Sequence, residues 1–257
     1  MDRVNRLKGT KAKQNPIMWM QGAVARLGAE ETIDKLFYDG FASISIGYIG
    51  VSETTKILKG QYDKQFAQKI LKALKDKCDL FKKRSNIGFS LYGTPAESYC
   101  YKAANAIKRE FGEDAIDKPY LTNSFHVPAW EEKHPMLKWG YEQGFAEIST
   151  GGNIVYVEVP NLSHNLKAYE GLLNYAYKIG LHYFALNTPV DQCYKCGFEG
   201  EFKAEIEGYH CPKCGNNEAG TLSVLRRVSG YISAPNTRPF NFGKQAEVID
   251  RVKHVKE

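Results

Sequence analysis

Four of the six cysteines form two Cys-x-x-Cys pairs in the last quarter of the chain: Cys193, Cys196, Cys211 and Cys214. This spacing is typical of a tetrahedral four-thiolate zinc site, in which each pair forms a tight turn around one metal ion. Gly197 and Gly215 each follow a pair, where such a turn favours a residue that tolerates positive φ. The sequence therefore predicts a structural zinc ribbon over residues 188–220.

Disulfide bonds and a redox-active pair are the alternatives for these cysteines. No apolar leader is visible and cytosolic thiols stay reduced, so disulfides are disfavoured. A redox role is disfavoured because the two pairs look alike and lack thioredoxin-like surroundings. Glutamates outnumber lysines between Cys193 and Cys214, so the ribbon lacks the basic surface that nucleic-acid phosphates require. We expect the ribbon to brace a neighbouring segment.

That segment begins with Arg227-Val-Ser-Gly-Tyr231 and continues through residues 232–243, which contain two prolines and no apolar period. This composition predicts a long irregular loop, a kind of segment that is often functional. Together with the ribbon and the closing Arg251–His254, it resembles the C-terminus of the anaerobic, glycyl-radical ribonucleoside-triphosphate reductases. In that family the glycine of the pentad stores the radical, so the resemblance implies Gly230 as the catalytic residue.

Glycine suits this chemistry. A radical at Cα is stabilised by the flanking amide and carbonyl when the centre is planar, and the missing Cβ lets another group approach closely. An ordinary turn glycine is the commoner interpretation, and it is the combination with ribbon and loop that favours the radical. The family usually has cysteine before this glycine, whereas this chain has Ser229, so any role of that thiol is lost.

A second candidate site follows a predicted strand at residues 87–91. Thr94, Pro95 and Glu97 fit a capping box with proline at the first helical position, so a helix is expected to begin there. Helix N-termini attract anions, although these side chains could simply satisfy the backbone. In the reductases this loop lies near the substrate phosphates. The resemblance therefore implies substrate binding by Thr94, Pro95, Ala96, Glu97 and Ser98.

Other elements are expected from periodicity and punctuation. Helices are predicted at 30–37, 56–84, 95–111 and, capped by Ser163, up to residue 178; strands are predicted at 41–50, 120–126, 152–159 and 181–186, after an irregular segment at 1–15. The strand–helix–strand order at 152–186 indicates parallel pairing. Cys78 and Cys100 lie on apolar helix faces and are expected in the core. His126 fits a catalytic base and an orienting hydrogen bond equally well.

The chain has 257 residues, 43% of them hydrophobic, and so can bury a substantial α/β core. The resemblance implies that residues 1–187 are the C-terminal portion of a ten-stranded α/β barrel of the glycyl-radical type. Residues 188–220 would then be the zinc ribbon, and residues 221–257 the radical loop with a terminal helix. The net charge of +6 comes largely from a solvated helix face, and no apolar run is long enough to cross a bilayer. We expect a cytoplasmic protein without membrane or nucleic-acid partners.

The resemblance implies reduction of ribonucleoside triphosphates to deoxyribonucleoside triphosphates. The family's thiyl cysteine lies upstream of the matched region, so the chain needs an N-terminal portion of the reductase. Because the sequence begins with Met1, a natural split subunit is expected, with a fragment as the alternative. Further implied partners are a separate activating enzyme that uses S-adenosylmethionine and an iron–sulfur cluster, and a second copy in a homodimer. The competing function is a zinc-ribbon binding module without radical activity.

Overall fold

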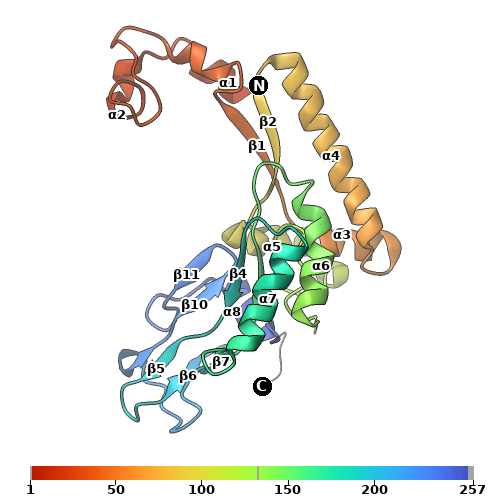
Figure 1. Cartoon of the computed structure of the whole chain (residues 1–257), viewed down its shortest axis with the longest axis vertical. Helices are drawn as coiled ribbons and strands as arrows, with labels where there is room; N and C mark the ends of the chain where they lie inside the picture. The colour runs from red at the N-terminus through yellow and green to blue at the C-terminus, as the bar shows by residue number, and fades with distance from the viewer. Residues whose placement is uncertain (1, 132, 254–257) are drawn as a thin grey trace. The chain divides into compact units, whose positions relative to one another are not determined.

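The structure is a computed structural model that describes residues 2–131 and 133–253, so Met1 and His254 lie outside the described residues. Two compact units divide the chain. One comprises Met1–Ile46 and Ala73–Leu91, and the other comprises Gly47–Lys72 and Tyr92–Glu257. Figure 1 shows the order of the elements along the chain.

The first unit is built from short elements around a small apolar core. These are α1 (Asp2–Leu7), η1 (Ala12–Gln14), α2 (Pro16–Trp19) and η2 (Ile33–Phe37), with η denoting a 3-10 helix. Val4, Ala12 and Ile33 are buried together, which explains why the segment expected to be irregular contains the helical elements α1 and η1. The helix expected at 30–37 is the shorter η2. Strands β1 (Ser43–Tyr48) and β2 (Gly88–Gly93) pair with each other and, like α4 (Lys64–Ser85), continue across the unit boundary.

The lysine-rich segment forms two helices, not the single one expected. Helix α3 (Val51–Lys59) ends at Gly60, which adopts the left-handed conformation with φ 74° and stops the helix before α4 begins. Helix α5 (Glu97–Phe111) also begins later than expected. Its N-cap residue is Ala96 and no side chain caps it, so the capping box predicted from Thr94, Pro95 and Glu97 is wrong.

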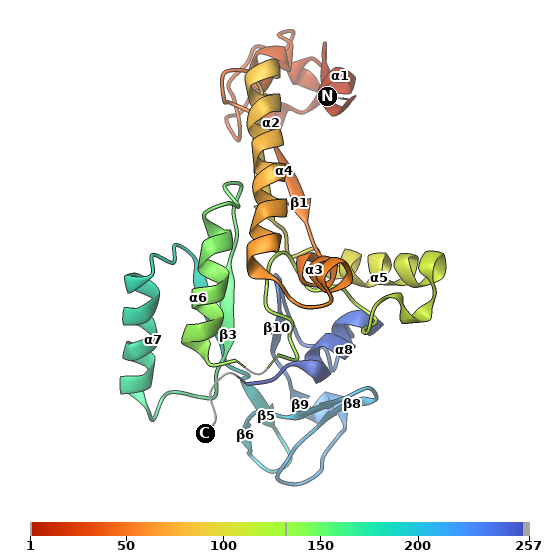
Figure 2. The same ribbon diagram turned by 90° about the vertical axis from the view of Figure 1, so that its right-hand side faces the viewer.

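In the second unit, β3 (Val155–Glu158) and β4 (Phe184–Asn187) form the parallel pair that the sequence predicts. They are joined by α7 (Leu166–Lys178), and α6 (Pro135–Ala146) packs against both β3 and α7 (Figures 1 and 2). The predicted Ser163 cap is wrong, because the side chain of Asn165 accepts the hydrogen bond from Ala168 N at 3.1 Å.

The segment 120–126 is not the strand expected from its sequence. Its backbone makes a single isolated bridge, between Ile49 and Asn123, yet every residue from Tyr120 to Val127 is buried. The segment is therefore a buried stretch of irregular backbone. Cys100 and Cys78 are buried as predicted, and Cys100 packs with Ala104 of the same helix. A short η3 (Glu113–Ala115) follows α5.

Short strands dominate the last quarter. The ribbon comprises β5 (Asp191–Cys193), β6 (Glu199–Gly200), β7 (Lys203–Glu205), β8 (Gly208–His210), η4 (Ala219–Thr221) and β9 (Leu222–Ser223). Strands β6, β5 and β9 form one sheet, and β7 and β8 form a hairpin. The loop expected at 232–243 is irregular only at 234–241, because β11 (Tyr231–Ser233) pairs with β10 (Arg226–Val228) and α8 (Phe242–Asp250) begins at Phe242. The fold class is mixed α/β. None of the described helices is long and apolar enough to cross a bilayer.

Candidate functional site

The four predicted cysteines converge on one point. Their sulfur atoms all lie within 4.8 Å of one another, with 3.8 Å between Cys193 and Cys214 and 3.6 Å between Cys196 and Cys211. A tetrahedral centre with Zn–S bonds of about 2.3 Å has sulfur–sulfur edges of about 3.8 Å, whereas a disulfide requires about 2.05 Å. The group can therefore hold a metal ion such as zinc, and the cysteines are not paired as disulfides.

Local backbone geometry explains this convergence. Gly197 and Gly215 both have φ near 70°, and each donates its N–H to the carbonyl of the first cysteine of its pair. Asn216, which no sequence pattern marks, is a buried residue whose Nδ2 lies 3.5 Å from the sulfur of Cys193. Burial raises the pKa of Cys193, but Asn216 and nearby backbone N–H groups outweigh burial and lower it to about 6. Such a bond also orients a metal-ligating thiolate.

A buried ion pair connects the ribbon to the following hairpin. Arg226 in β10 pairs with Asp191 in β5 and also donates to the Phe202 carbonyl at 3.1 Å. Asp191 accepts from the backbone N–H groups of Phe202 at 2.7 Å and Leu225 at 3.1 Å. These contacts anchor the start of the β10–β11 hairpin to the ribbon. The ribbon thus braces the segment that carries the pentad.

At the tip of this hairpin, Ser229 is buried and Gly230 is exposed. The Gly230 N–H donates to the Glu97 carboxylate at 2.6 Å, across 133 positions of sequence. A Cβ at Gly230 would lie well inside van der Waals contact with the same carboxylate oxygen and 3.3 Å from Pro95. The structure therefore brings together Gly230 and the 94–98 loop, which were predicted as sites separately.

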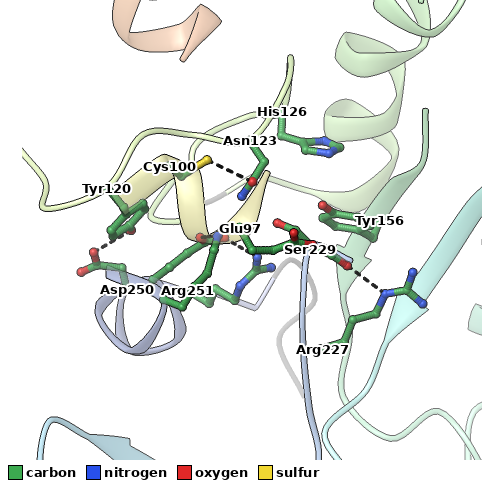
Figure 3. Close-up of polar contacts among 12 residues, drawn as sticks. Glu97, Cys100, Tyr120, Asn123, His126, Tyr156, Arg227, Ser229, Asp250 and Arg251 are labelled. Carbon is green, nitrogen blue, oxygen red and sulfur yellow. Dashed lines mark hydrogen bonds and ion pairs between the residues drawn. The ribbon is translucent and has the colours of Figure 1, made fainter. Parts of the chain in front are cut away.

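Further contacts fix the tip on either side. The Ser98 and Tyr231 hydroxyls are 3.1 Å apart, and the Tyr231 ring stacks on Phe240 with centroids 6.2 Å apart. Ser229 has φ 57°, a left-handed conformation that is uncommon for a residue with a side chain. Its carbonyl accepts from Arg227 Nε at 3.2 Å. The turn is thus held by its own hairpin as well as by the 94–98 loop (Figure 3).

His126 lies in a buried ionic cluster near this turn. Its Nδ1 is 3.2 Å from the Glu142 carboxylate, which also pairs with Lys138 Nζ at 2.6 Å. Burial lowers the pKa of His126. Burial raises the pKa of Glu142, but Lys138 and His126 outweigh it and lower the value to about 2. Of the two roles open from sequence, the structure shows His126 hydrogen-bonded to another side chain.

The C-terminal helix supplies a second buried network. Lys244 pairs with Glu247, and Arg251 joins Glu247 at 2.6 Å to Glu158 at the end of β3. A cavity of about 30 Å³ lies among these groups, with Ser229 and Tyr156 in its lining. Burial raises the pKa of the Tyr156 hydroxyl. Polar residues such as Glu158, Ser229 and Arg251 are among those that line the cavity, which is large enough for a water molecule.

The whole arrangement can be compared with known proteins. A family model described as anaerobic ribonucleoside-triphosphate reductase matches residues 1–254. The chain belongs to this family. The anaerobic ribonucleoside-triphosphate reductase of Escherichia coli K12 is 44% identical over 265 residues, covering 99% of this chain and 37% of that protein. The enzyme of that name from Enterobacteria phage T4 is 39% identical over 257 residues, covering 99% of this chain and 42% of its own length.

This reductase-family chain thus spans less than half the length of these relatives. Solved structures agree on the fold. An anaerobic ribonucleotide reductase superposes with a TM-score of 0.66 at 19% identity, over 83% of this chain and 34% of the other. The Thermotoga maritima anaerobic ribonucleotide reductase in complex with dATP and CTP gives a TM-score of 0.58 at 20% identity, over 76% and 32%.

Proposed function

We propose that the chain is the C-terminal part of an anaerobic reductase that converts ribonucleoside triphosphates to deoxyribonucleoside triphosphates, with Gly230 as the radical residue. The observation that carries this proposal is the packing of Gly230 against Glu97, in a chain that matches the family model over residues 1–254. Gly230 without the 94–98 loop beside it would support only a structural turn. The loop without Gly230 would support only an anion site.

The surroundings of Gly230 suit an unpaired electron at Cα. The hydrogen bond to Glu97 fixes the amide plane on one side of the carbon, and the absent Cβ leaves the centre free to become planar. Gly230 is exposed, so a separate activating enzyme that uses S-adenosylmethionine can reach it to remove a hydrogen atom. Ser229 is buried and therefore offers no second reactive group at the surface.

We place the substrate at the loop that contacts Gly230. Residues Thr94 to Ser98 lead into α5, whose N-terminal dipole favours anions such as a triphosphate. The Glu97 carboxylate faces the Gly230 amide, so phosphate contacts fall to the remaining residues of the loop. This arrangement would put the ribose close to the radical residue.

Zinc in the four-cysteine group would act structurally. All four thiolates are used as ligands in such a centre, which leaves no open position for a substrate. Its part in the reaction is indirect, through the Asp191–Arg226 pair that anchors the radical hairpin.

The remaining chemistry needs a partner. The thiyl cysteine would come from the N-terminal portion of the reductase, and the complete enzyme would form a homodimer. Among the described residues, β3 and β4 pair only with each other, although parallel strands normally lie inside larger sheets. An apolar groove of about 450 Å³ lies along β4 and α7, lined by Leu162, Leu166, Leu173 and Phe184 among others. The two-stranded parallel sheet and this groove support docking of the missing portion.

The competing binding module has less support. Part of the ribbon is used within the chain, since β5 holds Arg226 and the Glu205 carbonyl accepts from Gln245 of α8 at 2.9 Å. The acidic residues between the cysteines also disfavour contact with nucleic acid.

Anaerobic activation tests the proposal. The chain is combined with the N-terminal portion of a family reductase, the activating enzyme and S-adenosylmethionine, and electron paramagnetic resonance is recorded. A single α-hydrogen predicts a doublet, which should collapse to a singlet when the chain carries glycine deuterated at Cα. Gly230→Ala should abolish the signal.

Gly220→Ala is the matched control, because Gly220 lies in open space and should keep the doublet. A doublet that survives Gly230→Ala, or one that is insensitive to glycine deuteration, contradicts the assignment. Deoxyribonucleotide formation by the combined portions then tests the activity separately from the radical.

A further inference from the structure

Asn123 lies at the centre of the contact between the 94–98 loop and the hairpin tip, although no sequence pattern marked it. It is 3% exposed, and its backbone is fixed by the bridge to Ile49. Two hydrogen bonds fix the backbone of the neighbouring Thr122. Its carbonyl accepts from the Gly50 N–H at 2.8 Å, and its N–H donates to the Glu53 carboxylate at 2.8 Å. A buried primary amide must find partners for both its atoms, since an unpaired one is costly.

The Asn123 side chain meets this requirement with groups from three segments. In the orientation that satisfies both ends of the amide, its nitrogen donates to the Pro95 carbonyl. Its oxygen accepts from Ser229 Oγ at 2.6 Å and from Lys244 Nζ at 3.1 Å. The Cys100 sulfur lies 3.2 Å from the amide (Figure 3). One side chain thus connects the 94–98 loop, the hairpin tip and α8.

Two of the three segments it joins depart from relaxed backbone geometry. Ser229 has φ 57°, and Ala96, next to Pro95, has φ 26°. Residues with side chains persist in such conformations only when the surrounding structure holds them. One hydrogen bond of Asn123 is made by the side chain of Ser229, which itself has positive φ. Another is made by the carbonyl of Pro95, the residue before Ala96.

We propose that Asn123 is a positioning residue, which holds the Ser229–Gly230 turn against the 94–98 loop through one amide. Its nitrogen holds the loop and its oxygen holds the turn. The radical role of Gly230 rests on the proposed function, whereas the positioning itself does not. Ser229 gives this amide a hydroxyl donor, which is stronger than a thiol donor would be.

Single-residue hydrogen exchange of the full chain tests the proposal without radical chemistry. The reporter for the turn is the Gly230 amide, which donates to Glu97. The reporters for the loop are the Tyr99 and Cys100 amides, which both donate to the Ala96 carbonyl at 2.9 Å. Asn123→Ala should speed exchange at both reporters by about tenfold or more, because hydrogen bonds are lost to both. Amides of α7 should change by less than about twofold, since local opening leaves distant elements protected.

Two further variants separate the two ends of the amide. Ser229→Ala removes only the bond to the turn, so the Gly230 amide should exchange faster while Tyr99 and Cys100 stay protected. Asn123→Asp keeps an acceptor for Ser229 and Lys244 but loses the donor to the Pro95 carbonyl, so the loop reporters should respond more than Gly230. Asn153→Ala is the control, because its Nδ2 donates elsewhere, to the Ala146 carbonyl at 3.1 Å.

Unchanged exchange at both reporters in Asn123→Ala overturns the proposal. Equal responses of the turn and loop reporters in both Ser229→Ala and Asn123→Asp also overturn it. If Asn123→Ala exposes α7 as much as the reporters, the variant has lost stability generally. The proposal then stands only if Ser229→Ala still acts on the turn reporter and Asn123→Asp still acts mainly on the loop reporters. The activated enzyme gives a separate reading. If the doublet forms normally in wild type and weakens in Asn123→Ala, positioning serves the radical. If wild type gives no doublet, the proposed function fails while the exchange result stands.

Discussion

The cysteines of the metal group all lie between residues 193 and 214. The polar side chains around the hairpin tip, here called the polar cluster, come from segments spread between Pro95 and Arg251. The cysteine group depends on two local turns, each with a glycine near φ 70°. The cluster depends on long-range contacts such as Glu97 with Gly230 and Asn123 with Ser229.

The difference concerns how each region tolerates change. A metal centre built from local turns should form or fail as one unit, because its ligands close around a single ion. The cluster consists of several hydrogen bonds and ion pairs that share partners, so single changes should weaken it by graded amounts. The Asp191–Arg226 pair and the hydrogen bond from Gln245 to the Glu205 carbonyl join the ribbon to the C-terminal segment.

Loss of a metal ligand should give the largest effect. We expect Cys211→Ser to prevent tight metal binding and to unfold the ribbon, because about 10–16 kcal/mol of metal-binding free energy supports folding in structural zinc sites. Metal content and hydrogen exchange of residues 188–223 measure the change. Exchange should also rise in the β10–β11 hairpin if the ribbon braces it.

Cys78→Ala is the control, since this buried cysteine lies outside the metal group. It should lower stability and keep the metal. Retention of one metal ion per chain in Cys211→Ser would show that the group does not act as one unit.

The second largest effect should come from the ionic cluster beside the turn. Lys138→Met removes the cation paired with the buried Glu142 carboxylate and leaves it with His126 and the Val127 N–H, and removing one partner of a buried pair costs about 3–5 kcal/mol. Urea unfolding, followed by circular dichroism and by the fluorescence of the adjacent buried Trp139, measures the loss.

Lys35→Met is a matched control, because Lys35 and Glu31 form the same kind of Lys–Glu pair four residues apart on the surface. It should leave the unfolding midpoint unchanged, since exposed pairs contribute little. Equal effects of the two variants would contradict the view that burial gives the cluster its importance.

The comparison also explains what sequence could predict. The convergence of the four cysteines, their turn glycines, the parallel β3–β4 pair and the burial of Cys78 and Cys100 were predicted correctly, because each depends on spacing or periodicity within a short stretch. The predicted starts of two helices were wrong. Asn165 rather than Ser163 caps α7, and no side chain caps α5, since tertiary contacts rather than capping motifs decide where those helices begin.

The polar cluster could not be predicted in the same way. Asn123 sits in a segment whose alternation resembled a strand, but whose backbone makes one bridge and otherwise serves to place side chains in the interior. Nothing local distinguishes this asparagine from a surface one. The only sequence signal was the resemblance to a family, which identified Gly230 and the 94–98 loop but not the amide between them.

A smaller effect should follow from Gly230→Ala. The new Cβ meets Glu97 and Pro95, and displacing the carboxylate also loses its bond to the Gly230 amide, so we expect a cost of about 1–2 kcal/mol. Adding Glu97→Ala to this variant should cost less than Glu97→Ala costs in the wild type, because the carboxylate is already displaced and its bond to the Gly230 amide is already lost. Chemical unfolding of the four members of this cycle measures the coupling.

Gly171→Ala controls for the change of residue type. Gly171 lies within α7 and has open space for a Cβ, so alanine should stabilise the chain by about 0.5–1 kcal/mol. Strict additivity of Gly230→Ala and Glu97→Ala would mean that the two residues are not in contact.

The smallest effect should be the part of the pH dependence of stability that His126 contributes. Burial lowers the pKa of His126, with Lys138 and Arg251 acting in the same direction and Glu142 opposing them. The folded chain therefore disfavours protonated His126, while the unfolded chain gains a proton below a pH of about 6.5. Stability should be full above that pH and fall by up to about 1.4 kcal/mol per pH unit below it.

Urea unfolding of the metal-loaded chain at pH 7.5 and 5.5 measures this slope. His126→Gln should flatten it, whereas His164→Gln, at an exposed position, should not. Glu142 does not affect this slope between pH 7.5 and 5.5. Its pKa is lowered to about 2 in the folded chain, so the stability that it contributes is lost only below a pH of about 4.5. A slope that is unchanged in His126→Gln would place the pH sensitivity outside the cluster, and the graded response that distinguishes it from the metal group would then rest on Lys138 and Gly230 alone.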